Sequence, residues 1–329
     1  MANKAVPRIR IRAPEPFRLA GGARVALGKE LGRGSRAIVR EGLLDLSTGL
    51  KRPVTVKLYG HVASDERDAV HEALVTNASQ LHQADHPSLH VPFEVGLAGG
   101  IPYAVFARIK DARSLASALR ERTRVSLDAA LLIGVAVCEA VAAAHDAGVV
   151  HGDLSTRQVL LSAAGDVKVS DFGEYRTCQG TSGVQRAIPL RERLAHVAPE
   201  IVRGATPSFS TDVFSLGIIL NWLFQGPRFA NDIEGDALLA AVRSGEVVRP
   251  IFAPILPQEL ASILHRALSV RAADRYPNAV ELARELRSVL LSANLPDHRG
   301  FVREAIRSDD LARTIESGPS IDVDVDMGD

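Results

Sequence analysis

The hydrophobic pattern of this chain changes its period once, and that change most constrains what the chain can fold into. From residue 25 to about residue 110 apolar and polar residues alternate, as in Val54-Thr55-Val56-Lys57-Leu58, which is typical of half-buried strands. Within this region, residues 65–84 instead carry an apolar stripe at helical spacing. From residue 114 onward the pattern is mainly helical. The order predicts an α+β protein with two lobes, a small β-rich lobe with one main helix and a larger, mostly helical lobe.

The helical region contains one strongly apolar segment and one short hairpin. The apolar segment predicts a helix at 127–148 that ends at Gly148, and the charged residues in and beside it favour a buried core helix over a membrane span. Two short apolar runs at 159–161 and 167–169 flank a turn that joins them as a hairpin. Further helices are expected at 210–225, 234–244, 257–268 and 277–292.

Both ends of the chain differ from the middle, which we expect to form one domain over residues 25–291. Residues 1–24 are rich in proline and arginine and predict a flexible arm. Its basic residues are not followed by an apolar run, so it does not resemble a signal peptide. Residues 292–329 predict a tail with a possible helix at 301–316 and an acidic, disordered end.

Composition excludes several kinds of partner. The 39 basic and 39 acidic residues balance, which argues against a nucleic-acid coat or a strongly cationic membrane binder. The chain has 2 cysteines, too few for a disulfide framework or a four-thiolate zinc site, so a reducing cytosol is favoured. We therefore expect a cytoplasmic protein with no membrane span and no nucleic-acid partner, and with a protein partner that the sequence does not identify.

Two features of the strand-rich lobe could contact a phosphate. Gly32-Arg33-Gly34 lies between two predicted strands, where glycines let backbone amides approach phosphate oxygens. Lys57 lies on a predicted strand, where its ammonium group could act as a point charge for phosphate. Each feature alone is weak, because the first is equally a turn and the second equally a solvated lysine.

Two carboxylates of the helical lobe are expected to face one space. Asp153 lies in a loop after the long apolar helix, where it could accept a proton from a substrate hydroxyl. Asp171 directly follows the second hairpin strand, and the hairpin folds the chain back towards Asp153. A Mg²⁺ ion needs one or two carboxylates together with phosphate oxygens of a ligand, so this pair is a candidate magnesium site.

The order of these motifs resembles the eukaryotic-type protein kinase family, especially bacterial serine/threonine kinases. The order is the glycine loop, the strand lysine, His151-Gly152-Asp153, Asp171-Phe172-Gly173 and then Ala198-Pro199-Glu200. The resemblance covers roughly residues 25–291, and it implies a bilobal kinase fold with an N-lobe at 25–109 and a C-lobe at 110–291.

The resemblance also implies a role for each matching position. Asp153 matches the catalytic aspartate and Asp171 the aspartate that holds Mg²⁺. Lys57 would contact the α- and β-phosphates of ATP, Asp212 would brace the catalytic loop, and Glu200 and Arg275 would form a buried ion pair. The remaining ATP-binding positions would be Gly32, Gly34 and Val39 over the nucleotide, Phe106 as gatekeeper, Ala107 to Ile109 as the hinge and Leu160 under the adenine.

The catalytic loop departs from the family pattern. Gly152 replaces an arginine that normally meets a phosphorylated activation loop, so control by that route is doubtful. Ser155 replaces the usual lysine, and Arg157 stands where tyrosine kinases carry a compensating arginine. Gln158 replaces the asparagine that holds a second Mg²⁺, and its amide oxygen is displaced by one methylene.

Two other departures lie outside this loop. The helix glutamate that normally pairs with the strand lysine is replaced: the apolar stripe places Asn77 at that position, and Glu72 is the nearest acidic residue. A helix shifted in register would instead bring Glu72 to Lys57. Glu192-Arg193 stand where glycine and threonine usually precede the Ala-Pro-Glu segment.

Two function classes therefore remain. The first is an ATP-dependent protein serine/threonine kinase with ATP and Mg²⁺ as cofactors, Asp153 and Arg157 as its catalytic residues, and Asp171 and Gln158 as its metal ligands. The second is a pseudokinase, a nucleotide-binding or scaffolding module with little or no transfer activity. A small-molecule phosphotransferase is a third interpretation, against which the Ala198-Pro199-Glu200 segment favours protein substrates.

Overall fold

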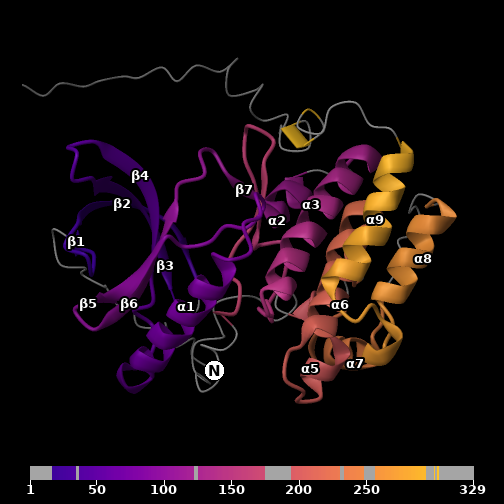
Figure 1. Ribbon diagram of the computed structural model, residues 1–329. Coiled ribbons are helices and arrows are strands. Elements are labelled where there is room, and N and C mark those ends of the chain that lie inside the picture. The colour runs from indigo at the N-terminus through magenta and orange to yellow at the C-terminus, as the bar shows by residue number, and fades with distance from the viewer. Residues whose placement is uncertain are drawn as a thin grey trace, which may run out of the picture.

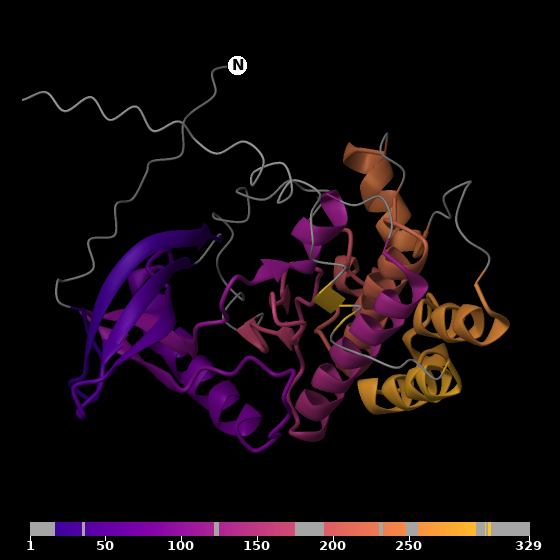
Figure 2. The same ribbon diagram turned by 90° about the horizontal axis from the view of Figure 1, so that it is seen from above.

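A computed structural model describes residues 17–34, 37–121, 125–174, 194–229, 233–247, 256–293, 300 and 302–303. It has two lobes, an antiparallel sheet with one main helix and a mostly helical body, which occupy opposite sides of the molecule in Figures 1 and 2. The α+β, two-lobed fold predicted from the sequence is confirmed.

The N-lobe sheet has the strand order β1-β2-β3-β4-β6-β5, with all neighbours antiparallel. Helix α1 packs on strands β5 and β6. The bounds are β1 Phe17–Arg18, β2 Arg24–Arg33, β3 Ile38–Asp45, β4 Lys51–Leu58, a 3₁₀ turn at Ser64–Glu66, α1 Arg67–Leu81, β5 Glu94–Ala98 and β6 Ile101–Ala107.

The first strand corrects the expectation of a flexible arm up to residue 24. Phe17 pairs with Val25 and Arg18 with Arg24, and the side chains of Phe17 and Leu19 are buried in the N-lobe core. Phe17 packs edge-on against Tyr103 with the ring centroids 5.2 Å apart. The apolar residues therefore bring this segment onto the sheet, whereas residues 1–16 of the expected arm lie outside the described residues.

The C-lobe is built around the central helix α3. Its elements are β7 Arg113–Ser114, α2 Leu115–Glu121, α3 Leu127–Asp146, β8 Val159–Leu161, β9 Val167–Val169, α5 Pro199–Val202, α6 Phe209–Phe224, α7 Gly235–Ser244, α8 Gln258–Ala267, a 3₁₀ turn at Ala272–Asp274 and α9 Ala279–Ala293. The expected hairpin is present as β8 and β9, which pair antiparallel, with β7 on the outer side of β8. The helix expected at 301–316 falls almost wholly outside the described residues.

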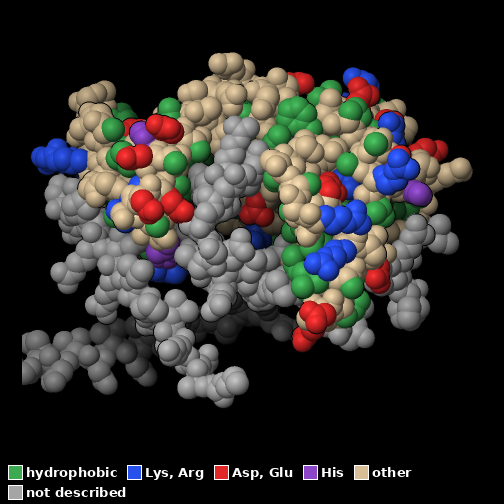
Figure 3. All heavy atoms as spheres, turned by 90° about the horizontal axis from the view of Figure 1, so that it is seen from below, with side chains coloured by type: hydrophobic (Ala, Val, Ile, Leu, Met, Phe, Trp, Pro, Cys, Tyr) green, Lys and Arg blue, Asp and Glu red, His purple; other side chains and the backbone are tan. Residues whose placement is uncertain are grey.

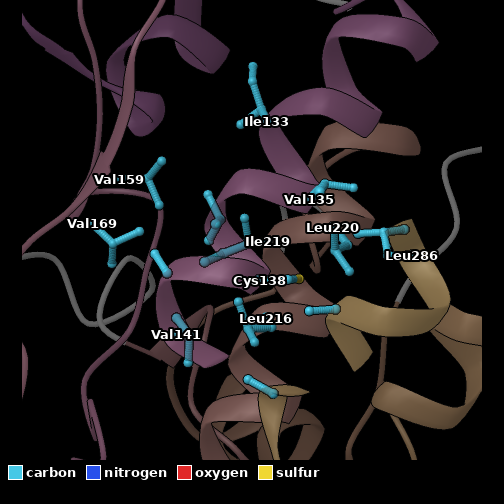
Figure 4. Close-up of a cluster of buried hydrophobic side chains, with 14 of the residues drawn as sticks. Ile133, Val135, Cys138, Val141, Val159, Val169, Leu216, Ile219, Leu220 and Leu286 are labelled. Carbon is cyan, nitrogen blue, oxygen red and sulfur yellow. The ribbon is translucent and has the colours of Figure 1, made fainter. Parts of the chain in front are cut away.

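Helix α3 shows why its apolar sequence belongs to a protein core. The Ser126 hydroxyl accepts a hydrogen bond from the Ala129 amide at the start of the helix, and Gly148 follows its end with φ +77°, as the sequence predicts. Side chains of α3, α6, α9 and the β8–β9 hairpin interlock around it (Figure 4). By length and composition α3 could cross a membrane, but 72% of its most apolar window is buried inside the structure, as expected for a core helix.

The surface agrees with the balanced charge of the chain. On the face seen in Figure 3, acidic and basic side chains are interspersed with hydrophobic ones over both lobes.

Candidate functional site

Strand β4 delivers Lys57 to a buried cluster of charges where the two lobes meet. The Lys57 Nζ atom lies 2.6 and 2.7 Å from the two carboxylate oxygens of Glu174 and 3.1 Å from Asp171 Oδ1. The Tyr59 hydroxyl donates a further hydrogen bond of 2.7 Å to Glu174. One ammonium group thus binds two carboxylates that come from a single loop of the C-lobe.

This loop follows β9 directly, and its backbone explains its side-chain directions. Asp171 has φ +68°, an uncommon left-handed conformation that a short polar residue tolerates. Phe172 is buried, and its ring packs against His151 with the centroids 4.7 Å apart. With Phe172 anchored in the core, Asp171 and Glu174 both face Lys57.

Burial and charge act in opposite directions on these groups. Burial alone would lower the pKa of Lys57, but the two carboxylates outweigh it and raise that pKa. Burial alone would raise the pKa of Asp171, but Lys57 holds it below its ordinary value. Burial and the neighbouring Asp171 raise the pKa of Glu174 despite the hydrogen bonds from Lys57 and Tyr59. Asp171 is therefore the carboxylate of the pair that favours the charged form.

Helix α1 presents Asn77, rather than Glu72, to the cluster. Asn77 is buried and lines the same small cavity as Asp171 and Glu174, whereas Glu72 is exposed. Gly173 has φ +70°, and a Cβ atom there would lie 2.3 Å from Asn77 Nδ2, so only glycine fits. The interpretation based on the apolar stripe is confirmed, and the helix supplies no carboxylate at this position.

Sequence analysis missed Glu174, the partner of Lys57. The two residues are 117 positions apart, and the pattern of the chain does not pair them. One available signal was an acidic residue directly after Asp171-Phe172-Gly173 in a chain whose helix carries Asn77. Tyr59 lies two residues after Lys57, on the same face of the extended chain, and its contact with Glu174 was also not predicted.

The loop that carries Asp153 is held by a buried carboxylate from α6. Asp212 accepts hydrogen bonds from the backbone amides of His151 and Gly152, at 2.7 and 2.9 Å. It also accepts one from His145 Nε2 at 2.9 Å, because the Ala279 amide donates to Nδ1 of that ring and leaves the proton on Nε2. The expected bracing of this loop by Asp212 is confirmed.

Backbone hydrogen bonds bring this loop beside Asp171. The Gly173 amide donates to the His151 carbonyl at 3.3 Å, and the Ser170 amide donates to the Gln158 carbonyl at 3.0 Å. Asp153 itself is exposed in the loop between these contacts. The loop that carries the exposed Asp153 is thus hydrogen-bonded to the segment that carries Asp171, which is half-buried and paired with Lys57.

The side chain of Gln158 is hydrogen-bonded within its own loop. The Ser155 hydroxyl donates to Gln158 Oε1 at 2.5 Å, so the residues that replace the family's lysine and asparagine bond to each other. Arg157 lines a separate pocket with His196, Trp222 and Arg228.

The predicted nucleotide-binding positions on the sheet lie on adjacent strands. Gly32 of β2 pairs with Val39 of β3, and Val39 pairs with Lys57 of β4. The Gly34 amide donates to the Ala37 carbonyl and closes the glycine turn, within which residues 35 and 36 lie outside the described residues.

The predicted hinge lies at the end of β6. Phe106 is buried against the ring of His90, whose Nε2 bonds to the Ala107 carbonyl at 3.0 Å. Ile109, just after β6, and Leu160 on β8 are half-buried. The roles of Phe106, Ala107, Ile109 and Leu160 in binding a nucleotide stay predictions.

The expected ion pair of the C-lobe is also present. Arg275 binds both oxygens of Glu200 at 2.7 and 2.8 Å, and its side chain is fully buried. Residues 175–193, with Glu192 and Arg193 among them, lie outside the described residues.

The donor set suits one magnesium ion better than two. Asp171 supplies a carboxylate that stays charged, which is the type of ligand that magnesium prefers beside phosphate oxygens. Gln158, the second predicted ligand, has its amide oxygen occupied by Ser155. No group of three histidine, cysteine or acidic residues that could hold a metal by itself occurs in the described part of the chain.

Comparisons with known proteins agree on one family. The sequence model described as protein tyrosine and serine/threonine kinase matches residues 25–286. Serine/threonine-protein kinase PknK of Mycobacterium tuberculosis is 30% identical over 273 residues, which are 79% of this chain and 23% of PknK. The probable serine/threonine-protein kinase CE0033 of Corynebacterium efficiens is 29% identical over 82% of this chain and 42% of its own. PknL of M. tuberculosis is 27% identical over 84% of this chain and 68% of PknL. The chain thus spans less than half the length of the first two relatives.

Proposed function

Because this chain belongs to the protein tyrosine and serine/threonine kinase family, we propose that it transfers the γ-phosphate of ATP to a serine or threonine hydroxyl of a protein. The observation that carries the proposal is the cluster of Lys57, Asp171 and Glu174, in which the lysine and the acidic loop are already in contact. The similar PknK, CE0033 and PknL proteins are named serine/threonine-protein kinases, which supports the choice of serine and threonine.

The residues of the site divide the work. Lys57 binds the α- and β-phosphates as a fixed positive charge, and Glu174 orients its ammonium group. Asp153 accepts the proton of the acceptor hydroxyl as the oxygen attacks phosphorus. Asp171 would hold magnesium, which would neutralise charge on the phosphates. Arg157 adds positive charge beside the loop in which Ser155 replaces lysine.

Protein substrates fit the C-lobe better than small molecules. The Ala198-Pro199-Glu200 segment is held firmly by the buried pair of Glu200 and Arg275. This anchoring provides a rigid floor beside the catalytic loop, on which an extended polypeptide can lie.

A second candidate function is a pseudokinase that binds nucleotide without efficient transfer. The bond from Ser155 to Gln158 favours it, because that bond occupies the amide oxygen expected to serve as the second metal ligand. In this case the chain would act through its nucleotide-dependent shape on a partner.

Transfer of labelled phosphate separates the two functions. Purified protein with radiolabelled ATP and Mg²⁺ is expected to label itself or a generic acceptor protein, and Asp153→Ala should abolish the labelling. Asp274→Ala, which removes a half-exposed carboxylate in the distant 3₁₀ turn, is the matched control and should keep the activity. Wild-type labelling no higher than that of Asp153→Ala, together with intact ATP binding, would favour the pseudokinase.

A further inference from the structure

A second pocket lies on the C-lobe side of the catalytic loop, and its chemistry differs from that of the Lys57 cluster. Its volume is about 100 Å³, and it lies between the catalytic loop, α2, α6 and the residues just before Ala198. The described residues that line it include three arginines and a histidine and no acidic residue: Arg120, Arg157, Arg228 and His196. The charged side chains among the described residues that line the pocket are therefore all basic.

Arg228 is the most unusual of these residues, because its guanidinium is buried and forms no ion pair with a carboxylate of the described residues. Its side chain is 1% exposed, and it donates to the backbone carbonyls of Glu246, Val197 and Ala195 at 2.9, 2.7 and 3.4 Å. Its Nη2 atom has no hydrogen-bond partner in the described part of the chain. A buried guanidinium without an opposite charge costs several kcal/mol of folding free energy, and a bound anion would offset that cost.

His196 adds a second unpartnered donor to the same pocket. The ring is 5% exposed, and its Nε2 atom accepts a hydrogen bond from the Thr156 amide at 3.5 Å. The ring proton is therefore on Nδ1, which has no partner among the described residues. Buried donors are nearly always satisfied in folded proteins, so two unsatisfied donors at one pocket indicate a missing acceptor.

The place of the pocket indicates where the acceptor comes from. Thr156 and Arg157 line it, and Thr156 lies three residues after Asp153, so their Cα atoms are at most about 11 Å apart. Ala195 and His196 also line it, and they directly precede the anchored Ala198-Pro199-Glu200 segment. A polypeptide whose hydroxyl reaches Asp153 would pass this opening within a few residues.

We propose that the pocket binds an anionic side chain, a carboxylate or a phosphate, of a polypeptide bound across the catalytic loop. The anion pairs with Arg157 at the rim. Arg228 Nη2 and His196 Nδ1 have almost no exposed surface in this structure, so a small shift of the pocket lining would let them donate hydrogen bonds to the anion. The inference rests on the proposed function, because it makes the pocket a determinant of protein-substrate choice. The substrates would then carry an acidic or already phosphorylated residue near the acceptor hydroxyl.

The single tryptophan of the chain provides the test. Trp222 lines the pocket and stacks on His196, with the ring centroids 5.9 Å apart, so its fluorescence reports on the occupant directly. The full chain, without nucleotide, would be titrated with two peptide pairs, phosphoserine against serine and glutamate against glutamine, and with inorganic phosphate. An anionic peptide should give a saturable change and bind at least about tenfold more tightly than its neutral counterpart and than inorganic phosphate.

Matched variants locate the binding. Arg157→Gln and His196→Phe, the second of which keeps an aromatic ring on Trp222, should each weaken anionic-peptide binding roughly tenfold. Arg271→Gln, at an arginine 81% exposed and outside the pocket, should leave it unchanged. Equal affinities for anionic and neutral peptides, or equal losses in all three variants, would overturn the proposal. Inorganic phosphate binding as tightly as the phosphopeptide would overturn the polypeptide source. Since no ATP is present, a failure of phosphotransfer does not affect the result.

Discussion

At the scale of single residues, the charge balance around Lys57 explains why the site tolerates Asn77. A buried lysine with no carboxylate would lose its proton or destabilise the fold, and here both of its partners come from the Asp171 loop. The Tyr59 hydroxyl donates a hydrogen bond to Glu174 and so fixes the orientation of that carboxylate. Tyr59 directly follows strand β4, which carries Lys57. The ion pair is thus complete without a contribution from helix α1.

Moving the carboxylate from residue 174 to residue 77 of helix α1 should test whether Glu174 serves as the partner of Lys57 in place of a helix residue. Glu174→Gln keeps an acceptor for Tyr59 but removes the charge, so kcat/KM is expected to fall roughly tenfold to a hundredfold. Asn77→Glu, added to Glu174→Gln, should restore much of the loss, because residue 77 lines the same cavity. Steady-state kinetics with ATP check both. A single variant Glu174→Gln that is as active as wild type, or more active, would contradict the orienting role.

His196 gives the fold a dependence on pH. Burial first, and then repulsion from Arg228 and Arg157, lower the pKa of His196 to about 3. An unfolded histidine, with a pKa of about 6.5, takes up a proton that the folded protein excludes. The stabilisation is therefore complete above the unfolded pKa and is lost as pH falls from about 6.5 towards 3. Between pH 7 and about pH 5 it should amount to about 2 kcal/mol.

Urea unfolding at both pH values measures this loss. His196→Phe has no titrating ring, so its free energy of unfolding should fall by about 2 kcal/mol less than that of the wild type. The other histidines titrate in both proteins and cancel in the comparison. Identical pH dependences in the two proteins would show that His196 is protonated in the folded state.

At the scale of elements, periodicity predicted most of the fold because burial sets the period. The strands β8 and β9 occur at the predicted residues, and α3, α6, α7, α8 and α9 agree within a few residues at each end. Strand β1 was missed because it is two residues long and follows a proline-rich stretch, so no period can be read from it. Helix α1 is shorter than predicted, since its first expected turn is a 3₁₀ turn and it ends at Leu81.

Only those site residues that belong to a sequence motif or to one face of a regular element could be predicted. Asp153, Lys57 and Asp171 stand in motifs whose order is visible in the chain, and Asn77 follows from the helical stripe. The bond between Lys57 and Glu174, and that between Ser155 and Gln158, depend on side-chain directions in irregular loops. The empty donors of Arg228 and His196 depend on packing from several elements at once.

The ion pair between Glu200 and Arg275 ties α5 to the chain that follows α8, and its loss should be costly. Arg275 also donates to the carbonyls of Ser269, Ser210 and Val270, so Arg275→Met leaves Glu200 half-buried without its partner. The free energy of unfolding is expected to fall by about 3–5 kcal/mol. Denaturant unfolding measures it, with the exposed Arg271→Met as a control that should change stability by less than about 0.5 kcal/mol. A loss at Arg275 no larger than that of the control would mean that neither the ion pair nor the carbonyl contacts of Arg275 stabilise this segment.

At the scale of the whole molecule, the two lobes gather around different hydrophobic clusters, and the C-lobe cluster also includes Leu81 at the end of α1. The N-lobe cores gather around Phe17 and Val56 and around Val70, whereas the C-lobe core surrounds α3. Between them, the amide of His90 donates to the Val169 carbonyl at 2.9 Å, and Lys57 binds the Asp171 loop. A ligand that contacts both lobes should therefore stabilise the molecule as a whole.

Nucleotide should raise the melting temperature in a way that depends on Lys57 and on magnesium. At about a hundred times its Kd, MgATP adds about 2.7 kcal/mol to the free energy of unfolding. Lys57→Met should remove most of this increment, whereas Lys51→Met, on the same strand but 64% exposed, should keep it. Chelating magnesium with EDTA should reduce the increment in the wild type. Equal increments in the two lysine variants would place the nucleotide away from Lys57.

The position of Glu174, three residues after Asp171, has a consequence for how the protein can be switched off. Where the acidic partner of the lysine lies on a separate helix, rotation of that helix can break the ion pair of the lysine and leave the metal ligand in place. Here both acidic residues lie on one short stretch of backbone. Displacing that stretch would therefore break both ion pairs of Lys57 and move the proposed magnesium ligand Asp171 at the same time. A regulator of this protein would accordingly act on the backbone around Gly173, either directly or through Asn77 of α1, which lies against Gly173.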